Sequence, residues 1–192
     1  MKEEGRNLLV IDAGNVLFRK APTSQKRRKE ALLKVDVLLK AYGEMGYSAV
    51  NIGEKDLIMG LGFLDEVAKR AKFPFVSTNL IDRKTRKTVF RSFITEEIAG
   101  IKVGIVGLMS QWVNEVLKGK EPYLEVLNPF GAVRPSVTEL RKSCDLVIVL
   151  SQLGERGDRE LALKVPGIDI IVGGAGVRGL GIRRSERPSC IA

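Results

Sequence analysis

The chain has 192 residues, of which 44% are hydrophobic and 29% charged, a composition that excludes a disordered chain and suits one globular domain. Its net charge is +9, and its longest apolar runs, such as residues 146–150, are far too short to span a bilayer, so we expect no membrane insertion. It contains no histidine, which excludes Ser-His, Cys-His and His-metal mechanisms for the chain acting alone.

Apolar runs alternate with segments of helical spacing along most of the chain. In chain order we expect a strand at 7–12, a helix at 25–43, a strand at 48–52, a helix at 61–71, a strand at 75–79, a hairpin at 89–97 and 101–108, a helix at 133–143, a strand at 146–150, a helix at 159–164 and a strand at 168–172. Runs of Val, Ile and Leu are typical of strands buried on both faces. The alternation predicts a layered α/β fold.

The last residues differ from the rest of the chain in composition and in hydrophobic periodicity. Residues 179–192 are basic and show no periodicity, so we expect a loose tail or a truncated continuation. Residues 1–178 are expected to form the domain.

Basic residues gather in three places along the chain: Lys26, Arg27, Arg28 and Lys29; Arg83, Lys84, Arg86 and Lys87; and Arg178, Arg183, Arg184 and Arg187. Such clusters can bind nucleic acid or another polyanion. Charge runs usually face water, however, and no aromatic residues are interleaved with these clusters to stack on bases. Nucleic acid is therefore a disfavoured partner, and a basic polyanion-binding module stays an alternative.

Polar or glycine-rich segments follow the predicted strands at 12–15, 53–56, 77–79, 151–154 and 173–176. In α/β folds the functional groups lie at the carboxyl ends of the strands, so these segments are candidates for one site. Turn formation is the alternative explanation for Asp12 and Asn15. No complete GxGxxG or P-loop motif follows a strand.

Several segments resemble one known family, in the right order. VIDAGN resembles a strand that ends in DAGD, AYGEMGYSAVNIGEKDL one that ends in GNHEF, and FPFVSTNL the segment FPFLSANI. GIKVGIVGLMS is similar to the hairpin strand that follows it, and DLVIVLSQLGERGDRELALKVPGIDIIVGGAGV to a segment with SHLG, D-x-x-LA and GIDVIVGGHTH. From residue 7 to 177 the chain is similar to the 5'-nucleotidase or UshA-like metallophosphoesterases. This resemblance implies an α/β/β/α sandwich, incomplete here at one or both ends.

The chain departs from the family's motifs at the residues that carry the chemistry. It has no segment like the family's first strand, which bears D-x-H. The metal-bridging aspartate is matched by Asn15, and the histidine of SHLG by Gln152. The asparagine ligand and the catalytic histidine are matched by Glu54 and Lys55. The last two histidines are matched by Ala175 and Val177.

These matches bear on cofactors and catalysis. The family uses two divalent metals to hold the phosphate and to activate hydroxide. Because the matched positions here lack most of the family's metal ligands, we expect that no such pair of metals forms. We therefore assign no catalytic residue, no metal ligand and no cofactor. An incidental Ca²⁺ or Mg²⁺ site at Asp12, Glu54 and Asp56 stays open. Lys55 could form an ion pair with Glu54 or Asp56, or hold phosphate as a point charge. The match also predicts that seven residues line one cleft: Asp12, Asn15, Glu54, Lys55, Asp56, Asn79 and Gln152.

Three functions follow as hypotheses. The first is a non-catalytic metallophosphoesterase-like domain that binds another domain or protein, with weak binding of phosphate or nucleotide. The second is an active phosphoester hydrolase of nucleotide catabolism whose missing ligands lie outside this chain. The third is the polyanion-binding module. The resemblance points to a periplasmic or extracellular location, although no signal peptide is visible in the sequence.

Overall fold

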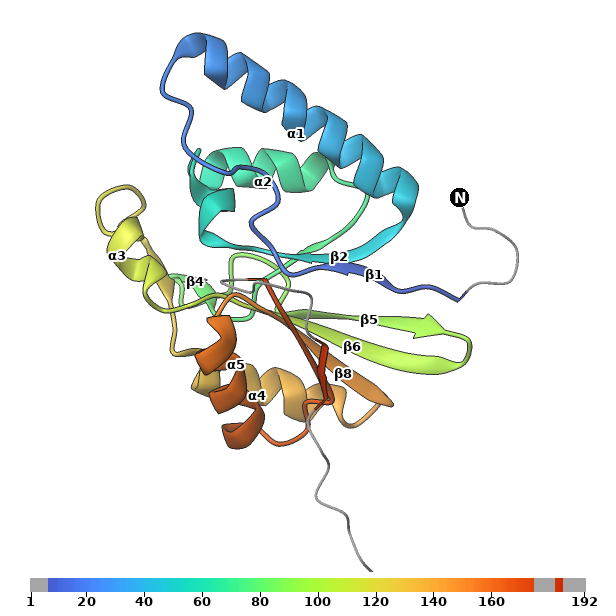
Figure 1. Ribbon diagram of the computed structural model, residues 1–192. Helices are drawn as coiled ribbons and strands as arrows, with labels where there is room; N and C mark the ends of the chain where they lie inside the picture. The colour runs from blue at the N-terminus through green and yellow to red at the C-terminus, as the bar shows by residue number, and fades with distance from the viewer. Residues whose placement is uncertain (1–6, 175–181, 185–192) are drawn as a thin grey trace, which may run out of the picture.

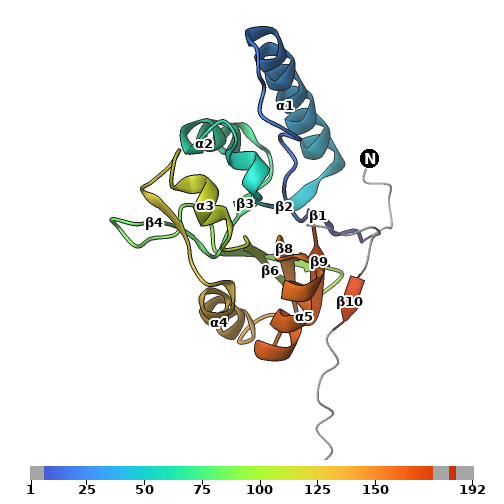
Figure 2. The same cartoon turned by 60° about the vertical axis from the view of Figure 1, so that its left-hand side comes forward.

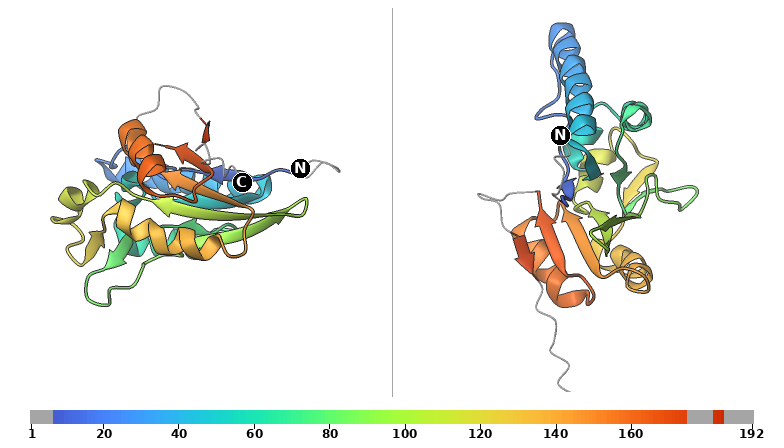
Figure 3. Two further views of the ribbon diagram at one scale, coloured as in Figure 1. Left: turned by 90° about the horizontal axis from the view of Figure 1, so that it is seen from below. Right: turned by 90° about the vertical axis from the view of Figure 1, so that its right-hand side faces the viewer.

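Two β-sheets pack face to face, and helices cover the outer face of each. The computed structural model describes residues 7–174 and the backbone of residues 182–184. Figure 1 shows α1 and α2 on one side of the sheets and α4 and α5 on the other, and the end-on view in Figure 3 separates the same layers. The predicted α/β/β/α sandwich is confirmed.

The first sheet is parallel throughout, with the strand order β1-β2-β3. Its outer face is covered by two helices. The longer one, α1, begins after Ser24, whose side chain accepts a hydrogen bond from the Arg27 N–H, and ends at Gly46 in the left-handed conformation with φ 73°. The elements are β1 (Val10–Asp12), α1 (Gln25–Met45), β2 (Tyr47–Asn51), a 3-10 turn η1 (Glu54–Leu57), α2 (Leu61–Arg70) and β3 (Phe75–Val76).

The second sheet has the order β10-β9-β8-β6-β5. Its central strands β6, β8 and β9 are parallel, while β5 and β10 are antiparallel edges. Figure 2 shows β10 beside β9. The elements are β5 (Phe93–Ile98), β6 (Ile101–Leu108), α4 (Pro129–Leu140), β8 (Leu146–Ser151), α5 (Gly154–Lys164), β9 (Ile170–Gly173) and β10 (Ile182–Arg184).

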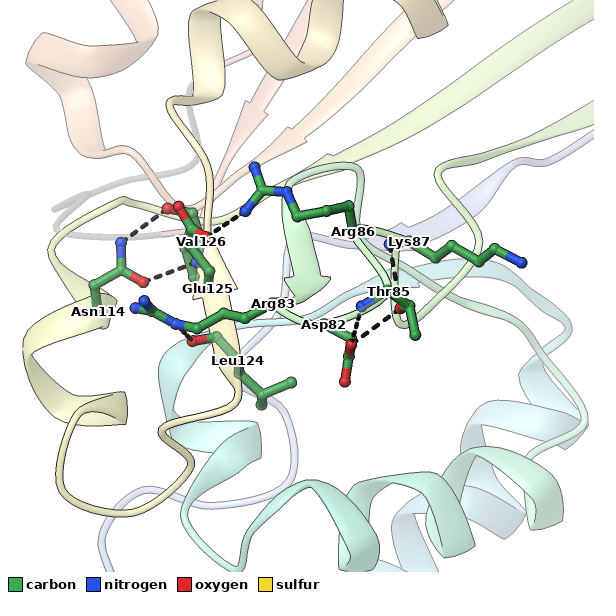
Figure 4. A network of polar contacts seen from close by, with 9 residues as sticks. All are labelled: Asp82, Arg83, Thr85, Arg86, Lys87, Asn114, Leu124, Glu125 and Val126. Carbon is green, nitrogen blue, oxygen red and sulfur yellow. Dashed lines mark hydrogen bonds and ion pairs between the residues drawn. The ribbon is translucent and has the colours of Figure 1, made fainter.

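A small antiparallel arm joins the two sheets, made of β4 (Leu80–Asp82) and β7 (Leu124–Val126), with the short helix α3 (Val113–Leu117) beside it. Figure 4 shows its polar contacts. The guanidinium of Arg83 donates to the Leu124 carbonyl oxygen at 2.9 Å, and Arg86 forms a 2.7 Å ion pair with Glu125. Two members of the second basic cluster therefore have partners on β7.

The apolar core lies in three layers. Between the sheets, Ala49 and Val76 of the first sheet pack with Ile105 and Leu150 of the second. Separate clusters fill the spaces between each sheet and its helices. Within the described residues, no helix combines the length and apolar character that a membrane crossing needs.

Most predicted elements are confirmed, but their bounds differ. The strand expected at 75–79 is wrong beyond Val76, because the backbone N–H of Thr78 leaves the first sheet and bonds to the Gly107 carbonyl of β6. The helix expected at 133–143 begins earlier, at Pro129, since the Asn128 side chain caps its first turn. The hairpin strand expected from 89 begins at Phe93.

Part of the expected tail is a strand. Residues 182–184 form β10, antiparallel to β9. The proposed boundary at residue 178 lies outside the described residues and stays a prediction.

Candidate functional site

The carboxyl ends of strands from both sheets meet around the Ala13 carbonyl. Asn51, at the end of β2, is fully buried, and its amide N–H₂ donates to the carbonyl oxygens of Ala13 at 3.0 Å and Leu108 at 3.1 Å. Leu108 ends β6, so one side chain ties the two sheets together. Sequence reasoning missed Asn51; a polar residue inside the apolar run at 48–52 was the available signal.

Two side-chain amides form a second connection between the sheets. Asn15 donates from Nδ2 to Oε1 of Gln152 at 2.8 Å, and Gln152 donates from Nε2 to the Ala13 carbonyl oxygen at 2.6 Å. The Oδ1 atom of Asn15 accepts from the Lys55 N–H at 2.8 Å. Asn15 has φ 65°, a left-handed conformation that asparagine tolerates better than most residues. We call Asn15 and Gln152 the amide pair.

The amide pair fills the space between the strand ends. A Cβ atom added at Gly53 would overlap Oδ1 of Asn15, and one added at Gly174 would overlap Nε2 of Gln152. The backbone must therefore come close to these side chains, and only glycine permits that approach.

Asp56 holds the loop that carries Asn15. Its fully buried carboxylate accepts from three backbone N–H groups, those of Asn15 at 2.8 Å, Leu17 at 2.9 Å and Gly53 at 2.9 Å. Burial raises the pKa of Asp56 to about 6 and the charge of Asp12 adds to this, while the three N–H donors act in the opposite direction.

Asp12 is engaged in the same way, with both oxygens occupied. One accepts from the Gly14 N–H at 2.8 Å and the other from the Tyr42 hydroxyl at 2.9 Å. The Tyr42 ring stacks on Tyr47 with 3.8 Å between centroids. Burial and the Asp12 charge raise the pKa of Tyr42, so it remains a hydrogen-bond donor to the carboxylate. Tyr42 is a second residue that sequence reasoning missed.

Two other predicted residues differ in their relation to this network: Asn79 makes its hydrogen bonds outside it, and Lys55 joins it only through the backbone. Asn79 bonds to the backbone of Met109 and Leu127 with both ends of its amide. Lys55 contributes its backbone N–H. Across residues 7–174, its ammonium forms no ion pair with Glu54 or Asp56, so that suggested role is wrong for this part of the chain.

Two further points concern metal ligation. Ala175 and Val177 lie outside the described residues. In the part of the chain that the structure describes, no three carboxylate or thiolate side chains are grouped so that they could hold a metal ion. The seven-residue cleft stays a prediction.

The chain was compared with known proteins. No model of a known protein family matches it. It is 27% identical over 198 residues to a 2',3'-cyclic-nucleotide 2'-phosphodiesterase/3'-nucleotidase of Salmonella typhimurium, covering 90% of this chain and 30% of that protein. It is 31% identical over 143 residues to a snake venom 5'-nucleotidase of Gloydius brevicauda, covering 71% of this chain and 24% of that protein.

Solved structures agree with these relatives. A 5'-nucleotidase precursor from Thermus thermophilus superimposes with a TM-score of 0.73 at 30% identity, covering 88% of this chain and 32% of that one. The calcineurin-like phosphoesterase YfkN from Bacillus subtilis shares the fold, with a TM-score of 0.74 at 21% identity, covering 86% of this chain and 57% of that one. The chain belongs to the 5'-nucleotidase branch of the calcineurin-like metallophosphoesterases. The resemblance seen in the sequence is thus confirmed. This metallophosphoesterase-like chain spans about a third of the length of the curated relatives it matches.

Proposed function

We propose that this metallophosphoesterase-like chain is not catalytic by itself and serves to bind or scaffold another domain or protein. The observation that carries the proposal is the amide pair. At the strand ends where the family's motifs imply metal ligands, Asn15 and Gln152 are bonded to each other and to the backbone instead.

The residues present do not fit a pair of divalent metals. Amide oxygens carry no charge and bridge two cations poorly, and the oxygen of each amide in the pair already accepts a hydrogen bond. At Gly53 and Gly174 the backbone lies so close to Oδ1 of Asn15 and Nε2 of Gln152 that even an added Cβ atom would overlap them on those sides. Asp12 and Asp56 direct their carboxylates to protein donors.

The chemistry follows from this arrangement. Hydrolysis of a phosphate ester requires that its negative charge be stabilised in the transition state and that a nucleophile be activated. Lys55 could hold a phosphate group as a point charge. Binding alone, equally strong in ground and transition states, does not raise the rate of the chemical step. Weak binding of phosphate or nucleotide without turnover is therefore the proposed behaviour.

The decisive test combines metal analysis with an activity assay. The purified chain is assayed on p-nitrophenyl phosphate with Mn²⁺, Zn²⁺, Co²⁺ or Mg²⁺ beside an identically purified blank. We expect no bound metal and no metal-dependent turnover above that blank. Metal-dependent turnover that disappears in Asp12→Ala or Glu54→Ala, but survives in the surface control Asp65→Ala, would overturn the proposal.

Active phosphoester hydrolysis remains the second candidate, and the relatives favour it. Their names include 3'- and 5'-nucleotidases, and they are about three to four times longer than the matched segment. In this case residues outside the chain would complete the site, and nucleotides would be the substrate class. The venom proteins among the relatives support a location outside the cytoplasm. Assaying 5'-AMP hydrolysis by a longer protein that includes this segment would decide in its favour.

A further inference from the structure

A groove lies between α1 and the segment that leads into it from β1. Figure 1 shows this segment running along the helical layer before α1 begins. The groove has a volume of about 490 Å³, within the ~300–1,000 Å³ usual for ligand sites. It lies on the first sheet's helical side and is separate from the amide pair, although Asn15 directly precedes its first lining residue.

The floor of the α1 groove is apolar. Val16, Ala31 and Leu38 line it, are half-buried and pack against the core beneath. Phe18 also lines it, and its ring is fixed by contact with Phe63 at 5.7 Å between centroids. The floor is therefore a firm apolar surface that remains partly open to solvent.

The rim of the α1 groove is cationic. Arg19, Lys20, Arg27 and Lys34 are exposed there, against one carboxylate, that of Glu30. Within residues 7–174, the guanidinium of Arg27 bonds only to the hydroxyl of Thr23, and the other three cations form neither an ion pair nor a side-chain hydrogen bond. Cations crowded without counter-charges repel each other, and an anion between them relieves that repulsion.

The direction of α1 strengthens the same potential. Its first turn contains no acidic residue, although the partial positive charge at a helix N-terminus favours anions there. Four cations at this end of the helix, Lys26, Arg27, Arg28 and Lys29, are thus unfavourable for the helix alone. An anionic ligand at the rim would be attracted both by these cations and by the positive end of the helix.

We propose that the α1 groove binds an anionic amphiphile, whose acidic head lies among the rim cations and whose hydrocarbon body covers the apolar floor. The inference is independent of whether the chain is catalytic. Charge complementarity selects the head group, and the floor selects an apolar chain over a free inorganic anion.

The test is calorimetric titration of the purified chain with monomeric dodecanoate, below its micelle concentration. We expect saturable one-to-one binding. Affinity should rise from octanoate to dodecanoate by about fourfold for each methylene that enters the groove. Acetate has the carboxylate head without a long chain, and dodecyltrimethylammonium has the long chain with a positive head. Both should bind far more weakly than dodecanoate.

Variants locate the site. The double variant Arg19→Glu/Lys34→Glu should weaken dodecanoate binding about tenfold, because two attractive charges become repulsive. The control double variant Lys102→Glu/Arg156→Glu reverses two exposed charges on β6 and α5, which belong to the second sheet and its helical layer, and should leave the affinity within about twofold. Thermal melting of each variant checks that the fold is retained. Equal affinity in the double variant and in wild type would overturn the proposal.

A vesicle experiment separates a pocket from a membrane surface. Binding to phosphatidylglycerol vesicles without binding of monomeric dodecanoate would overturn the proposal and assign the cations to an anionic membrane. Binding of dodecanoate that the double variant loses supports the groove, whether or not vesicles bind as well.

Discussion

The strand ends and the α1 groove treat polar groups in opposite ways. At the strand ends, buried amides and carboxylates bond to each other and to the backbone, so most of their capacity for hydrogen bonds is used within the protein. Among these described side chains, Oδ1 of Asn51 is the exception, because it has no hydrogen-bond partner. In the groove, exposed cations surround an apolar floor and have almost no partners in the described chain. The strand ends therefore leave few polar groups without partners, while the neighbouring α1 groove carries cations without counter-charges. Capacity to bind depends on which groups remain unsatisfied.

The largest effect is expected at Asp56. Asp56→Ala would leave the three buried N–H groups of Asn15, Leu17 and Gly53 without their acceptor. Each lost partner costs about 1–3 kcal/mol, so unfolding in urea should show a loss of about 3–5 kcal/mol. The exposed Asp65, whose partner is Lys69, serves as control, and its alanine variant should change stability by less than about 1 kcal/mol. Similar losses in both would show that Asp56 does not organise the strand ends.

A second prediction concerns pH and the same carboxyl group. Its pKa is raised to about 6 from an ordinary 3.8, so the folded state holds a proton that the unfolded state has lost between these values. The stabilisation from this group is present below pH 3.8 and is lost as the pH rises through 6, a change of about 3 kcal/mol. Carboxyl-carbon NMR titration measures the pKa directly. A midpoint near the ordinary value would mean that the three N–H donors fully offset the effect of burial, and it would contradict this prediction.

The amide pair should show a smaller, cooperative effect. Asn15→Ala and Gln152→Ala each break the bond between them, so the double variant should lose less stability than the two single losses combined, by about 1–2 kcal/mol. Denaturant unfolding of the four proteins in this cycle gives the coupling. Strict additivity of the two losses in stability would mean that the two amides act independently, and it would contradict the predicted coupling.

The smallest effect is expected on the β4–β7 arm. Arg86 and Glu125 form an ion pair whose side chains are 59% and 29% exposed, so Arg86→Ala should cost less than about 1 kcal/mol. The loss should shrink further at high salt, where exposed ion pairs are screened. Thermal unfolding at low and high ionic strength checks this. A large, salt-independent loss would show that Arg86 packs against the arm rather than acting through its charge.

Sequence patterns predicted the long helices and strands better than the short ones, and better than the contacts between side chains. Solid apolar strands and the long α1 have strong periodic signals, whereas α3 has five residues and β4 three, too short for periodicity to register. The strand end at Val76 depends on a bond from Thr78 to Gly107, which no local pattern encodes.

For the candidate residues too, the sequence indicated positions but not the hydrogen bonds between them. The family's motifs singled out Asn15 and Gln152, yet their hydrogen bond depends on the packing of two sheets. Asn51 and Tyr42 were missed because each joins the network only through hydrogen bonds to partners far along the chain. Lys55 was expected to use its charge, and its contribution to the network comes instead from its backbone N–H.

The hydrogen bonds of Gln152 to Asn15 and Ala13 join residues separated by 137 and 139 positions. Contacts of such long sequence separation carry a high loop-closure entropy and are expected to form late in folding. They would then add little to the rate of folding and much to the barrier against unfolding. The amide pair would then form only after both sheets have assembled, and it would act mainly by slowing the unfolding of the sandwich.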